Sequence, residues 1–212
     1  METPRKLCYD KRGPVLVKNL RARNFEAYYC STAREAVEKA LSLIPEGAKV
    51  GWGGATSARQ IGLTDAIHAG PYSVIDRDLL PTPEEREQAA RDCLSADVFI
   101  TGANAISLDG QMVNIDGNGN RVAAIIYGPK SVLVIAGMNK VTTDLEAAVV
   151  RARTVAAPIN AQRFPGQTPC RVNGVCGDCR SESCICNQIV ITRNCRPAGR
   201  ITFILVGEDL GF

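Results

Sequence analysis

Apolar side chains recur along this chain at two spacings, one helical and one extended. Within residues 33–44 and 145–157 they return every three to four positions, the period of an α-helix that buries one face. The sequence therefore predicts a helix in each segment, the second ending at Pro158 because proline interrupts a helix. An earlier, less regular helix is expected over about residues 15–27.

Four helix starts share one capping pattern. A serine or threonine is followed three positions later by glutamate or glutamine at Thr32, Ser57, Thr82 and Thr143. In such a capping box the hydroxyl accepts a hydrogen bond from the third helical N–H, while the acid or amide reaches back. We therefore expect helices to begin at these four positions.

Between the expected helices lie short runs of β-branched and apolar residues, each about as long as a strand. Runs that are apolar on both faces are typical of strands covered by helices on both sides, hence of a mostly parallel sheet. The sequence thus predicts an α/β fold with a mostly parallel sheet flanked by helices. The expected strands are residues 49–52, 72–75, 97–101, 122–127, 131–135, 188–192 and 201–206.

One long segment shows neither spacing. Residues 163–187 are rich in Cys, Gly and Pro, so we expect a loop that needs its own cross-link. The predicted organisation is an α/β core over 1–162, a cysteine-rich metal- or cluster-binding insertion over 163–187, and C-terminal strands over 188–212 that complete the core.

Composition and charge argue against two classes of protein. A hydrophobic content of 45% and a charged content of 22% are ordinary for a globular domain. The net charge of +3, with no run of bases longer than two, argues against nucleic acid as a partner. Apolar runs are too short to span a membrane, and the N-terminus lacks the apolar core of a signal peptide. We therefore expect a cytoplasmic protein without membrane insertion.

Among the nine cysteines, a cluster near the C-terminus is expected to bind a metal, since a reducing cytoplasm disfavours disulfides. Six of them lie between residues 170 and 195. Cys176 and Cys179 form a C-x2-C pair that reaches one metal from a tight turn, and Cys170 and Cys186 complete a set of four ligands. Four thiolates suit a [4Fe–4S] cluster, which we favour, or zinc. A redox-switching C-x2-C pair is the remaining alternative.

A glycine-rich loop follows the expected strand at 49–52. The run Gly51-Trp-Gly-Gly-Ala-Thr-Ser57 lets backbone N–H groups approach a ligand at the start of a helix, which favours an anion. The alternative is a tight turn whose glycines only allow close packing. The expected ligand-binding residues of this loop are Gly53, Gly54, Ala55, Thr56 and Ser57.

The densest polar stretch of the chain is residues 102–121. A turn at Asp109-Gly110 predicts a hairpin, and strand ends are where open α/β sheets bind their ligands. Arg121 would hold a carboxylate or phosphate, and Asp116 would orient it or act as a base, so these two are the candidate catalytic residues. The alternative is a hairpin with a Gly/Asn-rich turn. The other expected ligand-binding residues at this sheet edge are Asn104, Asn114, Asn120, Asn139 and Lys140.

Taken in order along the chain, these motifs resemble the LUD domain family, which is associated with lactate utilisation. The resemblance is carried by Gly-Trp-Gly-Gly at 51–54, Ile-Asp-Arg-Asp at 75–78, and the segments 101–106, 109–121, 128–130, 136–140, 144–148 and 206–211. The cysteines of longer members are similar in position to Cys170, Cys176, Cys179 and Cys186, with Cys184 and Cys195 as extras. The resemblance implies a fold like those of ribose-5-phosphate isomerase, glucosamine-6-phosphate isomerase and CoA-transferases.

The same resemblance implies a link to the oxidation of lactate to pyruvate within a multi-protein iron–sulfur system. We therefore expect a [4Fe–4S] cluster beside a small-anion pocket, in an iron–sulfur-dependent enzyme or a subunit of a lactate-oxidising system. The alternative is an isomerase- or transferase-like enzyme, or a ligand-binding protein, with a structural zinc site. The candidate partners are a small carboxylate or phosphate ligand, iron–sulfur redox proteins and a second copy of the chain.

Overall fold

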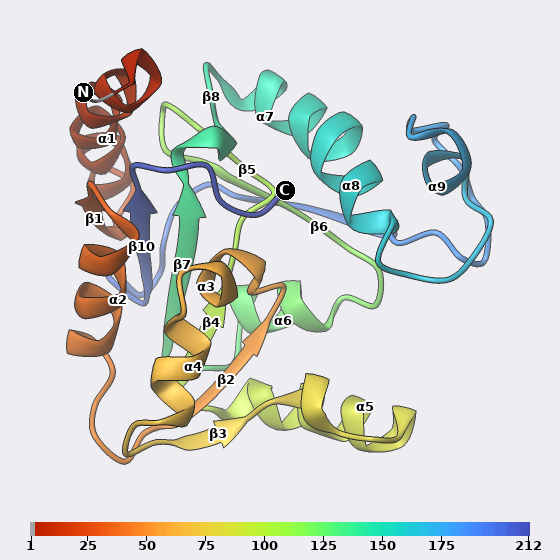
Figure 1. The fold of residues 1–212 in the computed structure, drawn as a ribbon, viewed down its shortest axis with the longest axis horizontal. Coiled ribbons are helices and arrows are strands. Elements are labelled where there is room, and N and C mark those ends of the chain that lie inside the picture. Colours follow the sequence, from red (N-terminus) through yellow and green to blue (C-terminus); the bar gives the residue numbers. More distant parts are fainter. Residues whose placement is uncertain (1–2) are drawn as a thin grey trace.

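Six parallel strands form the main sheet of the computed structural model, which describes residues 3–212 (Figure 1). Across the sheet they lie in the order β1-β10-β7-β4-β2-β3, with every neighbouring pair parallel. Their bounds are β1 (Glu26–Cys30), β2 (Lys49–Gly53), β3 (Ser73–Ile75), β4 (Val98–Thr101), β7 (Ser131–Gly137) and β10 (Ile201–Val206). β4 and β10 are buried at every position, as strands covered on both faces must be. The predicted α/β class with a mostly parallel sheet is confirmed.

Four shorter strands form a second sheet, in the order β8-β5-β6-β9. They are β5 (Ala105–Ser107), β6 (Met112–Asp116), β8 (Val141–Thr142) and β9 (Gln188–Thr192). The antiparallel pair β5–β6 confirms the predicted hairpin, and Gly110 in its turn has a φ of +91°. β9 pairs only with β6, so the strand expected at 188–192 lies at the edge of this second sheet.

Helices cover both faces of the main sheet, because successive side chains of β10 contact helices on opposite faces. Phe203 and Leu205 pack with α1 and α6, while Ile204 and Val206 pack with α2 and α4 on the other face. The helices are α1 (Pro4–Arg21), α2 (Ala33–Ser42), α3 (Thr56–Gln60), α4 (Leu63–His68), α5 (Pro83–Asp92), α6 (Asn120–Ile126), α7 (Leu145–Arg151), α8 (Ala157–Ala161) and α9 (Pro169–Asn173). Shorter turns are the 3-10 helices η1 (Arg77–Leu79), η2 (Cys93–Ser95) and η3 (Met138–Lys140) and the π-helix η4 (Ala152–Ala156).

Two of the four predicted caps are formed. Thr82 and Glu85 make the complete reciprocal box at the start of α5. At α2 the Thr32 hydroxyl accepts from the N–H of Glu35 at 3.3 Å, while the Glu35 carboxylate accepts from Ser31. Each bond satisfies a backbone donor that the helix leaves free.

The other two predicted caps are wrong. Helix α3 begins at Thr56, one residue before Ser57, and the Ser57 hydroxyl instead accepts a bond from Lys140. At α7 the cap is Asp144, whose carboxylate accepts from the N–H of Ala147 at 2.8 Å. A charged oxygen is the stronger acceptor at a helix start, which explains why it replaces the neighbouring threonine.

The helix predicted over 15–27 is wrong at both ends. α1 begins at Pro4, where the Thr3 hydroxyl accepts from the N–H of Lys6, and it ends at Arg21. Asn24 then has a φ of +62°, which turns the chain into β1. The sequence did not predict β1, because this strand is short and half polar and shows little periodicity.

The strand predicted over 122–127 is also wrong, because these residues form α6. Gly119 turns the chain with a φ of +80°, and the Asp116 carboxylate accepts from the N–H of Val122 at 3.0 Å. At the other end the Arg200 guanidinium donates to the carbonyls of Ala124 and Ile125 at 3.0 and 2.7 Å. Side chains distant in sequence thus satisfy both helix ends, which a short apolar run does not reveal.

The helix that starts at α7 continues past the proline that was expected to stop it. The π-helix η4 widens the turn, so the N–H of Ala157 bonds to the carbonyl of Ala152. Pro158 then occupies the first turn of α8, where a missing N–H costs little, and helical structure extends to Ala161. The predicted end at Pro158 is therefore wrong.

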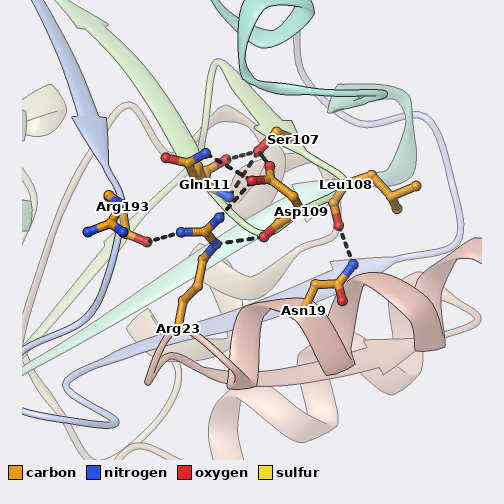
Figure 2. A network of polar contacts seen from close by, with 7 residues as sticks. All are labelled: Asn19, Arg23, Ser107, Leu108, Asp109, Gln111 and Arg193. Carbon is orange, nitrogen blue, oxygen red and sulfur yellow. Dashed lines mark hydrogen bonds and ion pairs between the residues drawn. The ribbon is translucent and has the colours of Figure 1, made fainter.

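A polar network ties the β5–β6 hairpin to the end of α1 (Figure 2). Arg23 donates to both the carbonyl and the carboxylate of Asp109 at 2.6 Å, and to the carbonyl of Arg193 at 3.3 Å. Asn19 donates to the carbonyl of Leu108 at 2.7 Å. Because Arg193 directly follows β9, whose last residue Thr192 pairs with Met112 at the start of β6, the Arg23 guanidinium links the chain after α1 to neighbouring strand ends of the second sheet.

No helix in the part of the chain that the structure describes is both long enough and apolar enough to cross a membrane.

Candidate functional site

A cavity of about 460 Å³ lies at the carboxyl ends of β2 and β4. This is where ligands bind in open parallel sheets. The glycine loop forms one wall, and the polar stretch that ends at Arg121 forms another. Residues 163–165 and 182–185, from the cysteine-rich segment, close a third side. The two polar motifs of the sequence therefore meet across one space.

Most of the residues singled out from the sequence line this cavity. From the glycine loop come Gly53, Gly54, Ala55 and Thr56, and from the remainder come Asn104, Asp116, Asn120, Arg121 and Lys140. Three of the expected residues lie outside the lining: Ser57, Asn114 and Asn139.

These three residues have other surroundings. Ser57 is buried behind the wall, where it accepts from the Lys140 amine at 3.1 Å. Asn139 accepts from the N–H of Leu210 at 3.0 Å and so holds the last turn of the chain. Asn114 is fully buried in β6, and its amide oxygen and nitrogen have no partner among the described residues.

Arg121 reaches the cavity from the first turn of α6. Its Nη2 donates to the Asn104 side chain at 2.9 Å and to the carbonyl of Ile115 at 2.5 Å, while its Nε lies 3.8 Å from the Asp116 carboxylate. Burial lowers the pKa of Arg121, but a guanidinium keeps its charge in proteins. No group in the described part of the chain accepts from Nη1, so this N–H group is available to a ligand.

Gly54 makes room for that guanidinium. A Cβ atom there would lie 2.7 Å from Cδ of Arg121, and the backbone φ is +61°. The expected helix start after this loop is α3, which has only five residues and no side-chain cap. The glycines therefore serve the close packing that was the alternative interpretation, while their backbone still lines the cavity.

Lys140 supplies the most enclosed charge of the site. The residue is 4% exposed, and no carboxylate in the described chain pairs with it. Burial, followed by the positive charges of Arg151 and Arg121, lowers the pKa of Lys140 to about 7. The amine is therefore neutral in a large share of molecules at neutral pH.

Sequence reasoning missed several lining residues, among them Arg59, Arg77, Asp78, Arg163 and Phe164. Arg77 and Asp78 follow β3, so the rule that ligands bind at strand ends would have found them. Arg163 and Phe164 belong to a non-periodic segment, and no pattern indicated that they fold back over the sheet.

Five cysteines surround a second, smaller cavity of about 60 Å³. They are Cys170, Cys176, Cys179, Cys184 and Cys186, so the four expected ligands and one of the two extra cysteines lie together. The sixth, Cys195, is elsewhere: it is 2% exposed in the core, where its Sγ accepts from the N–H of Ile201 at 3.3 Å. All nine cysteines are free thiols.

The thiol Cys186 is the centre of this group. Burial, with the neighbouring thiols Cys184, Cys170 and Cys176, raises the pKa of Cys186 to about 12. All four cysteines line the same cavity. The segment 163–187 contains one helical turn, α9, and is otherwise irregular, as predicted.

The side chains around this cavity are of the type that binds thiophilic metals. Five thiols and no histidine converge, and thiolates are the ligands of iron–sulfur clusters and of structural zinc. Within residues 3–212 no three Cys, His, Asp or Glu side chains already stand as the ligands of a single metal ion.

The two cavities share a wall. Cys184 and Ile185 line both the larger polar cavity and the cysteine cavity. The cysteine cavity and the cavity that Arg121 and Lys140 line are thus neighbours.

Comparison with known proteins places these features in a family. The family model of the LUD domain matches residues 14–206. The crystal structure of a DUF162 family protein from Deinococcus radiodurans is similar in fold, with a TM-score of 0.55, 9% identity, and coverage of 93% of this chain and 97% of that one. No curated protein matches the sequence.

Partial similarities extend to two ribose 5-phosphate isomerases. Isomerase A from Methanocaldococcus jannaschii gives a TM-score of 0.32 at 19% identity, over 52% of this chain and 53% of that one. The enzyme from Plasmodium falciparum gives 0.33 at 18% identity, over 52% of each chain. The family model, in contrast, spans nearly the whole sequence, from α1 to the end of β10. The chain belongs to the LUD domain family.

Proposed function

We propose that this chain binds a small organic acid in the larger cavity, next to a [4Fe–4S] cluster held by the cysteine cavity, and takes part in organic-acid redox metabolism of the lactate type. The observation that carries the proposal is the wall that Cys184 and Ile185 form between the two cavities. Iron–sulfur redox proteins would be its partners, and a reducing cytoplasm would keep its thiols free.

The charge of the larger cavity supports an anionic ligand. Arg59, Arg77, Arg121, Lys140 and Arg163 line it, against three acids, Asp78, Asp116 and Glu182. Arg59 is neutralised by Asp78 at 2.6 Å, whereas Nη1 of Arg121 has no acceptor in the described structure. A carboxylate or phosphate would complete this donor set through charge-assisted hydrogen bonds.

The residues that would hold the cluster are Cys170, Cys176, Cys179 and Cys186, as the spacing predicts. Cys184 is then the thiol that faces both cavities and would stand between the ligand and the centre. When bound, the cluster would supply one-electron transfer. The chain's own contribution is to fix the carboxylate at Arg121 and to limit water through burial.

The first test is the identity of the centre. Protein purified without oxygen should contain iron and acid-labile sulfide, absorb broadly in the visible range and give an EPR signal after reduction. Cys179→Ser should lose this iron, whereas Cys195→Ala should keep it because Cys195 lies in the core away from the cysteine cavity. Stoichiometric zinc without sulfide would overturn the cluster and support a structural zinc site.

The second test is proximity of the ligand. Adding lactate or pyruvate to the reduced protein should change the EPR signal, and Arg121→Met should abolish that change. An unchanged signal with either acid, in protein that retains its iron, would contradict the shared wall as a functional contact.

A further inference from the structure

Lys140 is the buried group that the proposed electron transfer leaves unused. It lines the larger cavity, yet its one hydrogen bond in the described structure goes to the hydroxyl of Ser57. A lysine that served as a structural cation would be expected to face a carboxylate, because an unpaired buried charge is costly. No such carboxylate is found among the described residues.

The surroundings keep this amine dry and partly neutral. Burial and the charges of Arg151 and Arg121 act in the same direction on its pKa, which is lowered to about 7. A Cβ atom at Gly211 would lie 2.8 Å from both Lys140 Nζ and Ser57 Oγ, so the glycine backbone near the end of the chain lies directly over the amine. A neutral amine in a cavity that limits water is a nucleophile.

We propose that Lys140 binds small 2-oxo acids covalently, by forming an imine between its Nζ and the carbonyl carbon. The nitrogen lone pair attacks that carbon, the two amine protons and the carbonyl oxygen leave as water, and a carbon–nitrogen double bond remains. The step needs neither oxidant nor reductant. The carboxylate of the same molecule would bind Nη1 of Arg121, which lines the same cavity.

This inference deepens the proposed function, because it rests on the small-anion pocket, but it does not depend on the metal centre. It limits the covalently bound ligands to acids with a carbonyl next to the carboxylate. Lactate would occupy the same cavity without a covalent bond, since it has a hydroxyl in place of the carbonyl.

The test is chemical trapping of the full-length protein. The protein is incubated with pyruvate and borohydride, which reduces an imine to a stable secondary amine, and each modified lysine is located by peptide mass spectrometry. We expect Lys140 to be modified at least about tenfold faster than any other lysine at neutral pH, because ordinary lysines are almost fully protonated there. Lactate in place of pyruvate should give no adduct, and excess inorganic phosphate should slow the reaction.

Two variants and one binding measurement complete the test. Lys140→Arg should abolish the adduct, while Lys130→Arg, whose side chain is 84% exposed, should leave it unchanged. Equal modification of all lysines would overturn the inference. Trp52 is the chain's one tryptophan and lines the cavity, so its fluorescence reports binding independently. Pyruvate that changes this fluorescence without an adduct at Lys140 would overturn the imine and keep the pocket, whereas loss of both would overturn the pocket as well.

Discussion

The amine of Lys140 donates a hydrogen bond to the hydroxyl of Ser57 at 3.1 Å, joining positions 83 residues apart. The bond connects η3, at the end of β7, with α3, at the end of β2. It fixes the amine at the wall of the larger cavity while leaving its charge unmatched. Lys140 therefore affects both the stability of the fold and the charge of the cavity.

The first prediction concerns the pH dependence of stability. In the unfolded chain Lys140 titrates near 10.5, and in the folded chain its pKa is about 7. Between these values the unfolded state binds more protons, so stability should rise with pH from about 7 to 10.5. At neutral pH and below, burying the protonated amine of Lys140 lowers the free energy of unfolding by an amount on the order of 4 kcal/mol. Lys140→Met should therefore be more stable than the wild type at pH 6.5, by urea denaturation.

The difference between Lys140→Met and the wild type should shrink as the pH approaches 10. Cysteine and tyrosine residues that titrate in this range are common to both proteins, so their effects cancel in the difference. A difference that stays constant from pH 6.5 to 10 would contradict the lowered pKa.

The second prediction concerns Gly54. Alanine there would have a positive φ and place its Cβ 2.7 Å from Cδ of Arg121. Gly62 has a similar φ of +78° with nothing within 4 Å, so Gly62→Ala isolates the backbone strain, about 1–2 kcal/mol. Gly54→Ala should cost a further 1–3 kcal/mol or so, and it should weaken anion binding because the guanidinium moves. Equal losses in the two variants would exclude the contact.

The third prediction concerns the network of Figure 2. Arg23→Ala should lower the free energy of unfolding by about 1–3 kcal/mol at pH 7, because it removes the side-chain bond to the carbonyl of Asp109 and the one charged donor to its carboxylate. Arg193→Ala is the matched control, since Arg193 contributes only its backbone carbonyl. Thermal or urea unfolding of both variants measures the difference.

The same network predicts an acid-side effect. Burial alone would raise the pKa of Asp109, but hydrogen bonds from Ser107 and Gln111, and the charge of Arg23, lower it overall. A carboxylate with a lowered pKa stabilises the fold above its unfolded pKa, and this stability is lost as the pH falls through the folded value. The destabilisation by Arg23→Ala should therefore be smaller at pH 3 than at pH 7. An effect that is the same at both values would mean that the carboxylate does not contribute.

The fourth prediction concerns anion binding at Arg121. Inorganic phosphate should change the fluorescence of Trp52, and Arg121→Met should weaken the binding by about ten- to a hundredfold, the loss of one charged hydrogen-bonding group. Arg91→Met, on the exposed face of α5, is the control and should bind as the wild type does. Equal affinity in both variants would place the anion elsewhere.

Much of the sheet could be predicted because its strands are apolar on both faces. The run 201–206 is buried at all positions and is recognised for that reason. The run 122–127 has the same composition and forms a helix, since its ends are held by Asp116 and Arg200 from other parts of the chain. Short apolar runs are ambiguous when the deciding contacts are distant in sequence.

The candidate site could be predicted in part, for a similar reason. Residues within a few positions of a strand end, such as Asn104 after β4 and Lys140 after β7, lie at the cavity because parallel strands end together. Asn114 shares a face with Asp116 but sits one pleat earlier, where β6 is fully buried. Arg163 reaches the cavity through a fold of the cysteine-rich segment that has no sequence period.

The position of β10 has a consequence for synthesis. It follows all the other described strands in the sequence, yet it lies between β1 and β7, and it is the one partner of β1 among the described strands. During synthesis β1 therefore has no partner strand, and one edge of β7 is unpaired, until β10 has been made. Unpaired strand edges favour association with other chains. The cysteine-rich segment leaves the exit tunnel before the sheet can close. Its thiols are thus exposed to solvent before the core that anchors them is complete.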